Sequence, residues 1–190
     1  MMALRFAVLL FAMGIVFFMP DVKGIMTPAI TYIQPVQLIE VPFVELLSAK
    51  GTRSEILELA AAVENLNIVY SSQCFAREVF TRDFTETDGM NNQEIYNRLR
   101  SGVKGIHVIY YTGSFFENHL FGVIGYIRDS IPDTVFQNRY FVKDRNDIAR
   151  NLIHEIAHLW GFNHYQVLPT TVPYQMNDIW DICAGELGIN

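Results

Sequence analysis

The sequence has little charge, and positive charge is the scarcer sign. Lys and Arg number 14 among 190 residues, Asp and Glu number 20, and the formal net charge is −6. There is no block of like charge and no basic patch interleaved with aromatic residues. Nucleic-acid binding is therefore disfavoured, because a protein that binds phosphates needs Lys and Arg to displace counterions. Internal repeats and low-complexity tracts are absent too, so no repeat architecture is expected.

Long hydrophobic runs are also scarce. One apolar run, Phe6 to Met19, follows the positive charge of Arg5. A membrane-spanning helix needs roughly 20 apolar residues, so this run is short for one. We predict that residues 1–24 are a secretory signal peptide cleaved after Gly24, and that residues 25–190 form a single secreted or periplasmic domain without stable membrane insertion. The alternatives are an uncleaved anchor and a buried helix.

Cysteine is rare, with only Cys74 and Cys183 in the chain. In an oxidising compartment two cysteines indicate one disulfide. That bond would close a loop of about 110 residues and stabilise the fold by up to roughly 4–5 kcal/mol on the chain-entropy model. The alternative is a pair of buried, unpaired thiols.

What the chain does contain is a globular composition, with 51% apolar and 18% charged residues, enough for one domain with a core. Alternating, β-branched and amphipathic stretches predict its strands and helices. Strands are expected over Thr31–Phe43, Asn67–Ser71, Gly105–Thr112, Leu120–Asp129 and Thr134–Val142. Helices are expected over Ser54–Leu66, capped by Ser54, within Asn91–Gly102, and over Asp178–Ile189, packed on the core.

A further helix should begin near Asp144 and run to Gly161, with Asp144 or Asn146 as its cap. Apolar residues cover most of its circumference, which is typical of a buried helix. The remaining polar face carries His154 and His158. Strands followed by a buried helix with polar groups on one face predict a layered fold of sheet and helix, with a site under the sheet.

The stretch HEIAHLWGFNH, from His154 to His164, contains three histidines and one glutamate. Four residues advance a helix by about 400° and raise it by about 6 Å, so His154 and His158 share a face and can bind one metal ion. Gly161 can take a positive φ and end the helix, which lets the chain bring His164 to the same metal. Glu155 lies about 100° around from His154, close enough to hydrogen-bond a metal-bound water.

Three neutral imidazoles leave a fourth position open for water, which is the layout of a catalytic zinc site. Zinc lowers the pKa of that water to near 7, and Glu155 can take its proton and pass it to a leaving amine. The hydroxide would attack a carbonyl that zinc also polarises. The alternative is a helix with histidines and no metal. A required Gly and a third His, added to HExxH, make that alternative a rare coincidence.

The motif resembles the HExxHxxGxxH signature of the metzincin metallopeptidases, and the order of expected elements is similar as well. The resemblance implies an α+β, zincin-like fold. Its twisted mixed sheet would have an antiparallel edge strand, a backing helix and an active-site helix, followed by a small C-terminal subdomain. It also implies one Zn²⁺ ion, held by His154, His158 and His164, with Glu155 as the catalytic base.

The edge strand that the resemblance implies would hold extended substrate by strand addition. In this sequence it falls within Leu120–Asp129. The alternative is an ordinary strand of the sheet. The residues expected to bind substrate are Gly122, Val123, Ile124, Gly125 and Tyr126.

A methionine turn beneath the zinc is also implied, and it falls on Met176, the methionine that follows His164. The alternative is a core methionine. Several metzincins carry a tyrosine two residues after this methionine as an extra zinc or transition-state ligand. Asp178 stands there in this chain, and the nearby Tyr165 and Tyr174 do not match by position.

The resemblance divides the domain into an N-terminal part, about residues 25–161, and a C-terminal part, about residues 162–190. It allows a disulfide between the two parts, which Cys74 and Cys183 would form. We therefore expect a monomeric, secreted zinc endopeptidase that acts on proteins or peptides. The alternatives are a non-catalytic zinc-containing peptide-binding module and a narrow-specificity effector or toxin. Glu155 favours an enzyme, because a structural zinc site needs no base.

Overall fold

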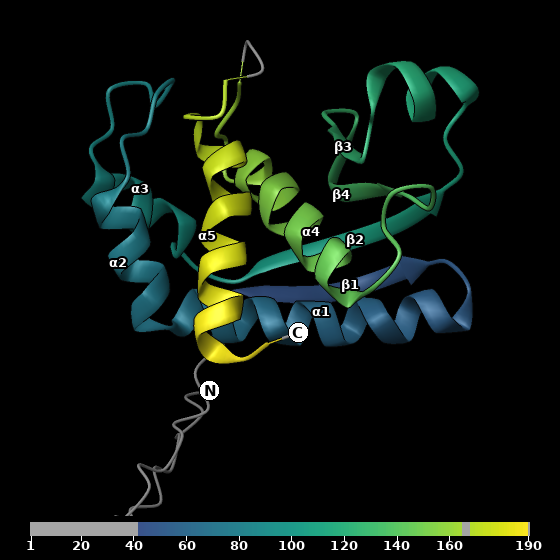
Figure 1. Ribbon diagram of the computed structural model, residues 1–190, viewed down its shortest axis with the longest axis horizontal. Helices are drawn as coiled ribbons and strands as arrows, with labels where there is room; N and C mark the ends of the chain where they lie inside the picture. The colour runs from purple at the N-terminus through teal and green to yellow at the C-terminus, as the bar shows by residue number, and fades with distance from the viewer. Residues whose placement is uncertain (1–41, 165–167, 190) are drawn as a thin grey trace, which may run out of the picture. The chain divides into compact units, whose positions relative to one another are not determined.

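The structure is a computed structural model that describes residues 42–164 and 168–189. The expected signal peptide, residues 1–24, lies outside the described residues, as does most of the expected strand over Thr31–Phe43. Within the described ranges, no helix is both long enough and apolar enough to cross a membrane. These residues form an α+β fold with a four-stranded mixed sheet and several helices (Figure 1).

The sheet has the strand order β1-β2-β4-β3. Its strands are β1 (Val44–Lys50), β2 (Lys104–Tyr111), β3 (Gly125–Arg128) and β4 (Ile131–Asn138). β1, β2 and β4 are parallel neighbours, whereas β3 runs antiparallel to β4 at the edge. Along β2, Ile106, Val108 and Tyr110 are buried in alternation, so one face of the sheet packs on the core.

The α-helices of the described residues pack against the sheet or against one another. They are α1 (Arg53–Ser71), α2 (Gln73–Thr81), α3 (Asn92–Leu99), α4 (Arg145–Leu159) and α5 (Val172–Leu187). The sequence predicted α3 and α4 but not α2, and it predicted α5 with a start at Asp178 in place of Val172. α4 contacts α1, α5, β3 and β4 (Figure 1), which explains why Leu152, Ile153 and Ile156 are fully buried. Asp144 caps α4, because its Oδ1 accepts a hydrogen bond from the Asp147 backbone N–H at 2.9 Å.

Helix α1 is longer than predicted, and the expected strand over Asn67–Ser71 is wrong because these residues continue the helix. Val69 and Tyr70 are fully buried, so the apolar stripe of the helix simply extends toward the core. The amide of Asn67 accepts a hydrogen bond from the Val44 backbone N–H and donates one to the Val44 carbonyl, both at 2.9 Å. This part of α1 thus holds the start of β1.

The N-terminus of α1 is capped by Thr52, in place of the expected Ser54. Thr52 Oγ1 accepts from the Glu55 backbone N–H at 3.3 Å, and the Glu55 carboxylate accepts from the Thr52 backbone N–H at 2.6 Å. This reciprocal pair is a capping box. Arg139, which follows β4, donates from Nε to the same carboxylate at 2.6 Å, so the start of α1 is tied to the end of β4.

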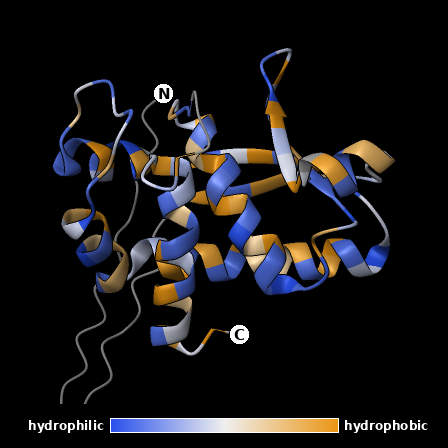
Figure 2. Cartoon of the chain, turned by 45° about the horizontal axis from the view of Figure 1, so that its top comes forward, coloured by the Kyte–Doolittle hydropathy of each residue, from blue (hydrophilic) through white to orange (hydrophobic). Residues whose placement is uncertain are grey.

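A disulfide joins Cys74 of α2 to Cys183 of α5, as the cysteine count predicted. Trp180 of α5 is buried, and its Nε1 donates to Asn146 Oδ1 of α4 at 2.7 Å. Figure 2 shows hydrophilic and hydrophobic residues in alternation along α5, which ends at the label C. The predicted packing of the C-terminal helix on the core is therefore confirmed.

Candidate metal centre

Three histidines come together at the C-terminal end of α4. His154 and His158 lie one turn apart on the helix, and His164 follows its end. One ligand nitrogen from each ring lies within 4.8 Å of the other two. The ring centroids are 5.0 Å apart for His154 and His158, and 4.8 Å apart for His158 and His164. This cluster can hold a metal ion, and it is formed by the residues that the motif predicted.

Gly161 turns the chain so that His164 reaches the cluster. Its φ is +90°, a value that L-residues rarely adopt. A Cβ at this position would also lie 2.7 Å from the guanidinium of Arg98. That guanidinium is held in place, because Arg98 Nε donates to the Trp160 carbonyl at 2.7 Å. The predicted role of Gly161 at the helix end is thus confirmed.

The backbone after the helix orients one of the imidazoles. His158 Nδ1 lies 2.8 Å from the Phe162 carbonyl oxygen, so Nδ1–H donates there and Nε2 is left as the lone-pair nitrogen. Metal-ligating histidines commonly make such a bond through their second nitrogen. Phe162 is buried, which keeps this carbonyl in position beside the cluster.

The surroundings keep the imidazoles of His154 and His158 neutral. Burial, together with the neighbouring His158 and His164, lowers the pKa of His154 to about 3. Burial also lowers the pKa of His158. Both rings are therefore uncharged at neutral pH, which is the form that binds a metal ion.

Glu155 lies beside the cluster and points into the same hollow. Only 4% of the residue is exposed, and burial raises its pKa to about 8. A carboxyl group with such a pKa can gain or lose a proton near neutral pH. This position and protonation behaviour suit a group that transfers protons.

The cluster forms one wall of a hollow of about 530 Å³. Opposite it lies the edge of the sheet. The segment expected to bind substrate lines this hollow in full: Gly122, Val123, Ile124, Gly125 and Tyr126. The structure therefore brings the predicted edge segment and the predicted metal ligands to the same cavity.

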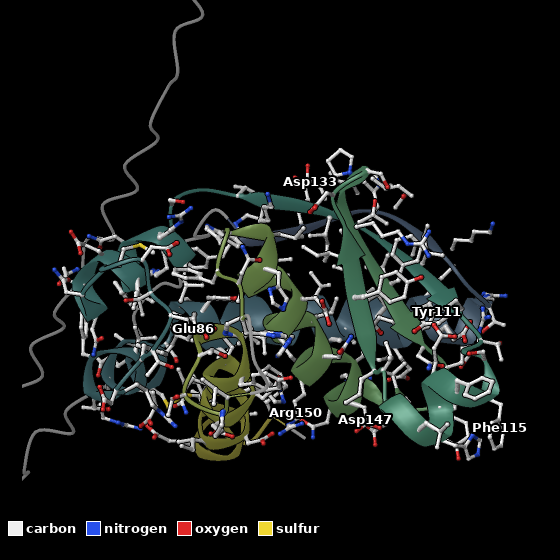
Figure 3. The ribbon with its side chains drawn as sticks, turned by 90° about the horizontal axis from the view of Figure 1, so that it is seen from above. Glu86, Tyr111, Phe115, Asp133, Asp147 and Arg150 are labelled. Carbon is white, nitrogen blue, oxygen red and sulfur yellow. A yellow bond between two sulfur atoms is a disulfide. The ribbon has the colours of Figure 1, made fainter. Side chains whose placement is uncertain are left out.

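The edge segment is only partly a strand, so the strand expected from Leu120 is corrected. β3 begins at Gly125, and residues Glu117–Phe121 form a helical turn. Ser114 starts this turn, because its Oγ accepts from the Glu117 backbone N–H at 3.3 Å. The turn projects from the end of the sheet, with the exposed ring of Phe115 on its outer side (Figure 3).

Asn138 at the end of β4 fastens the edge segment to the sheet. Its Nδ2 donates to the Val123 carbonyl at 2.9 Å and to Asn118 Oδ1 at 2.7 Å. Its backbone N–H donates to the Ile124 carbonyl at 2.9 Å. Asn138 is fully buried, so the wall of the hollow opposite the cluster rests on a buried amide that sequence patterns did not single out.

Met176 lies in α5, so the expected methionine turn is corrected to a helix. The helix begins at Val172, with Pro173 in its first turn, a position that proline favours. Met176 is fully buried in the core and does not line the hollow. Asp178 lies away from the hollow and pairs with Arg82 at 3.6 Å. Tyr165 lies outside the described residues.

Tyr174 contacts the cluster. Its ring centroid lies 5.0 Å from that of His154 and 4.9 Å from that of His164, and it lines the hollow. The sequence left open whether Tyr165 or Tyr174 assists the site, because the position of Tyr174 depends on how α5 packs against α4. Asn151 and Asn177 also line the hollow and were likewise not predicted.

No protein-family model matches the chain. Comparison with the curated proteins finds no match, and comparison with the solved structures finds none.

Proposed function

We propose that the protein is a zinc-dependent endopeptidase that hydrolyses peptide bonds in proteins or peptides. The observation that carries this proposal is the cluster of His154, His158 and His164 with the buried carboxyl group of Glu155 beside it. All four line one hollow, and the edge of a sheet forms the opposite wall.

The donor set fits zinc. Three imidazole nitrogens are a common ligand set for catalytic zinc, with one position left for water or substrate. Neither cysteine can serve as a thiolate ligand, because Cys74 and Cys183 form a disulfide. Within residues 42–164 and 168–189 the cluster has no fourth His, Cys, Asp or Glu ligand. Structural zinc sites use four protein ligands, so this set favours catalysis over a purely structural role.

Glu155 is the group that moves the proton. When bound, the metal polarises the scissile carbonyl and makes a water molecule more acidic. The carboxylate of Glu155 accepts the proton of the attacking water and delivers it to the nitrogen of the leaving amine. Burial alone raises the pKa of Glu155 to about 8; a cation nearby favours the carboxylate form with which the reaction begins.

The edge strand β3 supplies a surface for an extended peptide. In the part of the chain that the structure describes, β3 pairs with β4 on one side and with no strand on the other. A peptide can add to such an edge through main-chain hydrogen bonds. Residues 122–126 line the hollow that contains the cluster, so a peptide bound there would pass beside Glu155.

Two further observations support the proposal. The antiparallel edge strand and the helix that carries HExxH agree with what the resemblance to metzincins implies, although Met176 departs from it. The disulfide agrees with export to an oxidising compartment. We propose a secreted or periplasmic protein, and N-terminal sequencing of exported material should begin at Ile25.

Digestion of a fully randomised peptide mixture tests the function. We compare the wild type, Glu155→Ala and the matched control Glu64→Ala, whose glutamate is exposed on α1. The wild type and Glu64→Ala should cut the same bonds, whereas loss of the base should slow cleavage by about 10²–10⁴-fold. All three proteins should bind one zinc ion per chain, measured by elemental analysis.

A randomised mixture is needed because an enzyme of narrow specificity would not cleave a single general substrate. Zinc binding by all three proteins without any cleavage that depends on Glu155 would refute the proposed peptidase activity. If peptides then bind without being cut, the protein is a zinc-containing peptide-binding module.

A further inference from the structure

Asn151 carries an unmet hydrogen-bonding group in the hollow. It lies on α4, one turn before Glu155 and on the same side of the helix. Only 7% of the residue is exposed, and it lines the hollow. Among the residues that the structure describes, its Nδ2 has no hydrogen-bond partner. A buried amide without a partner costs free energy, so it needs an explanation.

The amide of Asn151 lies against the edge strand. A Cβ added to Gly125 would overlap Asn151 Nδ2, and it would meet the Phe136 carbonyl at 2.9 Å. Gly125 is therefore a position where the absence of a side chain lets the amide approach the strand backbone. This places an N–H donor between α4 and the strand that would hold a peptide.

Two other amide side chains differ from Asn151. Gln137 has no partner among the described residues for either side-chain atom, but it does not line the hollow. Asn177 lines the hollow, but its Nδ2 lies 3.5 Å from Nδ1 of His154, within the metal cluster. Asn151 therefore combines a buried donor without a partner with a position in the lining of the hollow.

We propose that Asn151 is a substrate-binding residue whose side-chain N–H donates a hydrogen bond to a carbonyl oxygen of the bound peptide. This inference rests on the proposed peptidase function. The acceptor is either a main-chain carbonyl or the side-chain carbonyl of an Asn, Gln, Asp or Glu residue seated in the hollow. Both sources present the same chemistry to the amide, and the experiment below separates them.

Peptide affinity is measured in the Glu155→Ala background, where a bound peptide is not cut. The probe is the randomised peptide mixture with a fluorescent label, read by anisotropy and by sequencing of the retained peptides. Asn151→Leu removes the donor at similar volume, and Asn151→Asp replaces it with an acceptor. The control is Asn97→Leu, on the exposed side of α3.

Asn151→Leu should weaken peptide binding by about tenfold, equivalent to about 1.4 kcal/mol, and Asn151→Asp should weaken it more. Asn97→Leu should leave it unchanged. Zinc content and melting temperature are recorded for every variant, to show that the metal site and the fold remain intact. In the Glu155-intact protein, Asn151→Leu should lower kcat/KM to a similar extent.

The pattern of the loss identifies the acceptor. If it is a main-chain carbonyl, the affinity of all peptides falls alike. If it is a side-chain carbonyl, Asn151→Leu loses the preference for one class of residue at one peptide position and binds other peptides as before.

Unchanged affinity and unchanged sequence preference in a folded, zinc-loaded Asn151→Leu protein would overturn the inference, and a buried water would then be the partner of the amide. Cleavage that depends on Glu155, together with this result, leaves the peptidase proposal standing. Absence of both cleavage and peptide binding in the wild type refutes the two together.

Discussion

Replacing Gly161 by alanine tests how the third histidine is delivered. Gly161 has a φ of +90° and separates the end of α4 from His164. A methyl group there would lie 2.7 Å from the Arg98 guanidinium. The mutant chain must either retain this strained turn or open it and move His164 away from the cluster.

The magnitude follows from these contacts. A positive φ costs an L-residue roughly 1–2 kcal/mol. Displacing the Arg98 guanidinium would break its hydrogen bond to the Trp160 carbonyl. A hydrogen bond from a charged donor contributes about 1.5–3 kcal/mol to stability. Retaining the turn should therefore cost about 2.5–5 kcal/mol. Opening the turn removes one of three ligands, so zinc affinity should fall at least about tenfold, or about 1.4 kcal/mol.

Zinc titration against a competing chelating dye measures the affinity, and urea denaturation of the metal-free protein measures stability. The matched control is Gly188→Ala, since Gly188 also has a positive φ, +67°, with nothing within 4 Å of an added Cβ. This control should lose roughly 1–2 kcal/mol of stability, the cost of the positive φ alone, and retain its zinc affinity. Wild-type zinc affinity in Gly161→Ala would refute the idea that this turn positions His164.

Three further predictions concern the surroundings of the site. Tyr174→Ala should weaken zinc binding in the dye assay whereas Tyr174→Phe should not, because the ring packs against two imidazoles; equal effects would contradict a packing role. Reducing the Cys74–Cys183 disulfide should lower the free energy of unfolding by about 2–4 kcal/mol, measured by urea denaturation with and without dithiothreitol. Arg139 lowers the pKa of Glu55, so the stabilisation is complete above the ordinary glutamate pKa and is lost as the pH falls through the lowered pKa. Arg139→Ala should therefore destabilise the protein at neutral pH and progressively less in acid. Urea unfolding of both proteins at several pH values measures this. A difference in the free energy of unfolding that stayed constant with pH would contradict it.

Local patterns predicted those elements whose signals lie within the elements themselves. The start of α4 was predictable because Asp144 is a capping residue followed by an apolar run. β2 was predictable because its buried residues alternate. The end of α1 was not predictable from local patterns, because Asn67–Ser71 contains β-branched and aromatic residues that suit a strand. These residues are helical because Val69 and Tyr70 pack against the core in that conformation.

In the candidate site, too, local sequence signals predicted some features and tertiary packing determined the others. The spacing of the histidines and Gly161 determined which residues could meet at a metal, since helical geometry and one permitted turn are local properties. The sequence also indicated a disulfide, because Cys74 and Cys183 are its only cysteines.

Tertiary structure alone decided what surrounds the histidine cluster. The ring of Tyr174 lies against two imidazoles because α5 packs on α4, and Asn138 holds the opposite wall through hydrogen bonds across the sheet edge. Asn151 faces Gly125 because α4 lies against β3. Such contacts join residues far apart in the chain, and they arise only when packed elements bring their side chains together. For this protein the sequence alone specified the three histidines that could hold a metal ion, and the tertiary structure specified the cavity in which they lie.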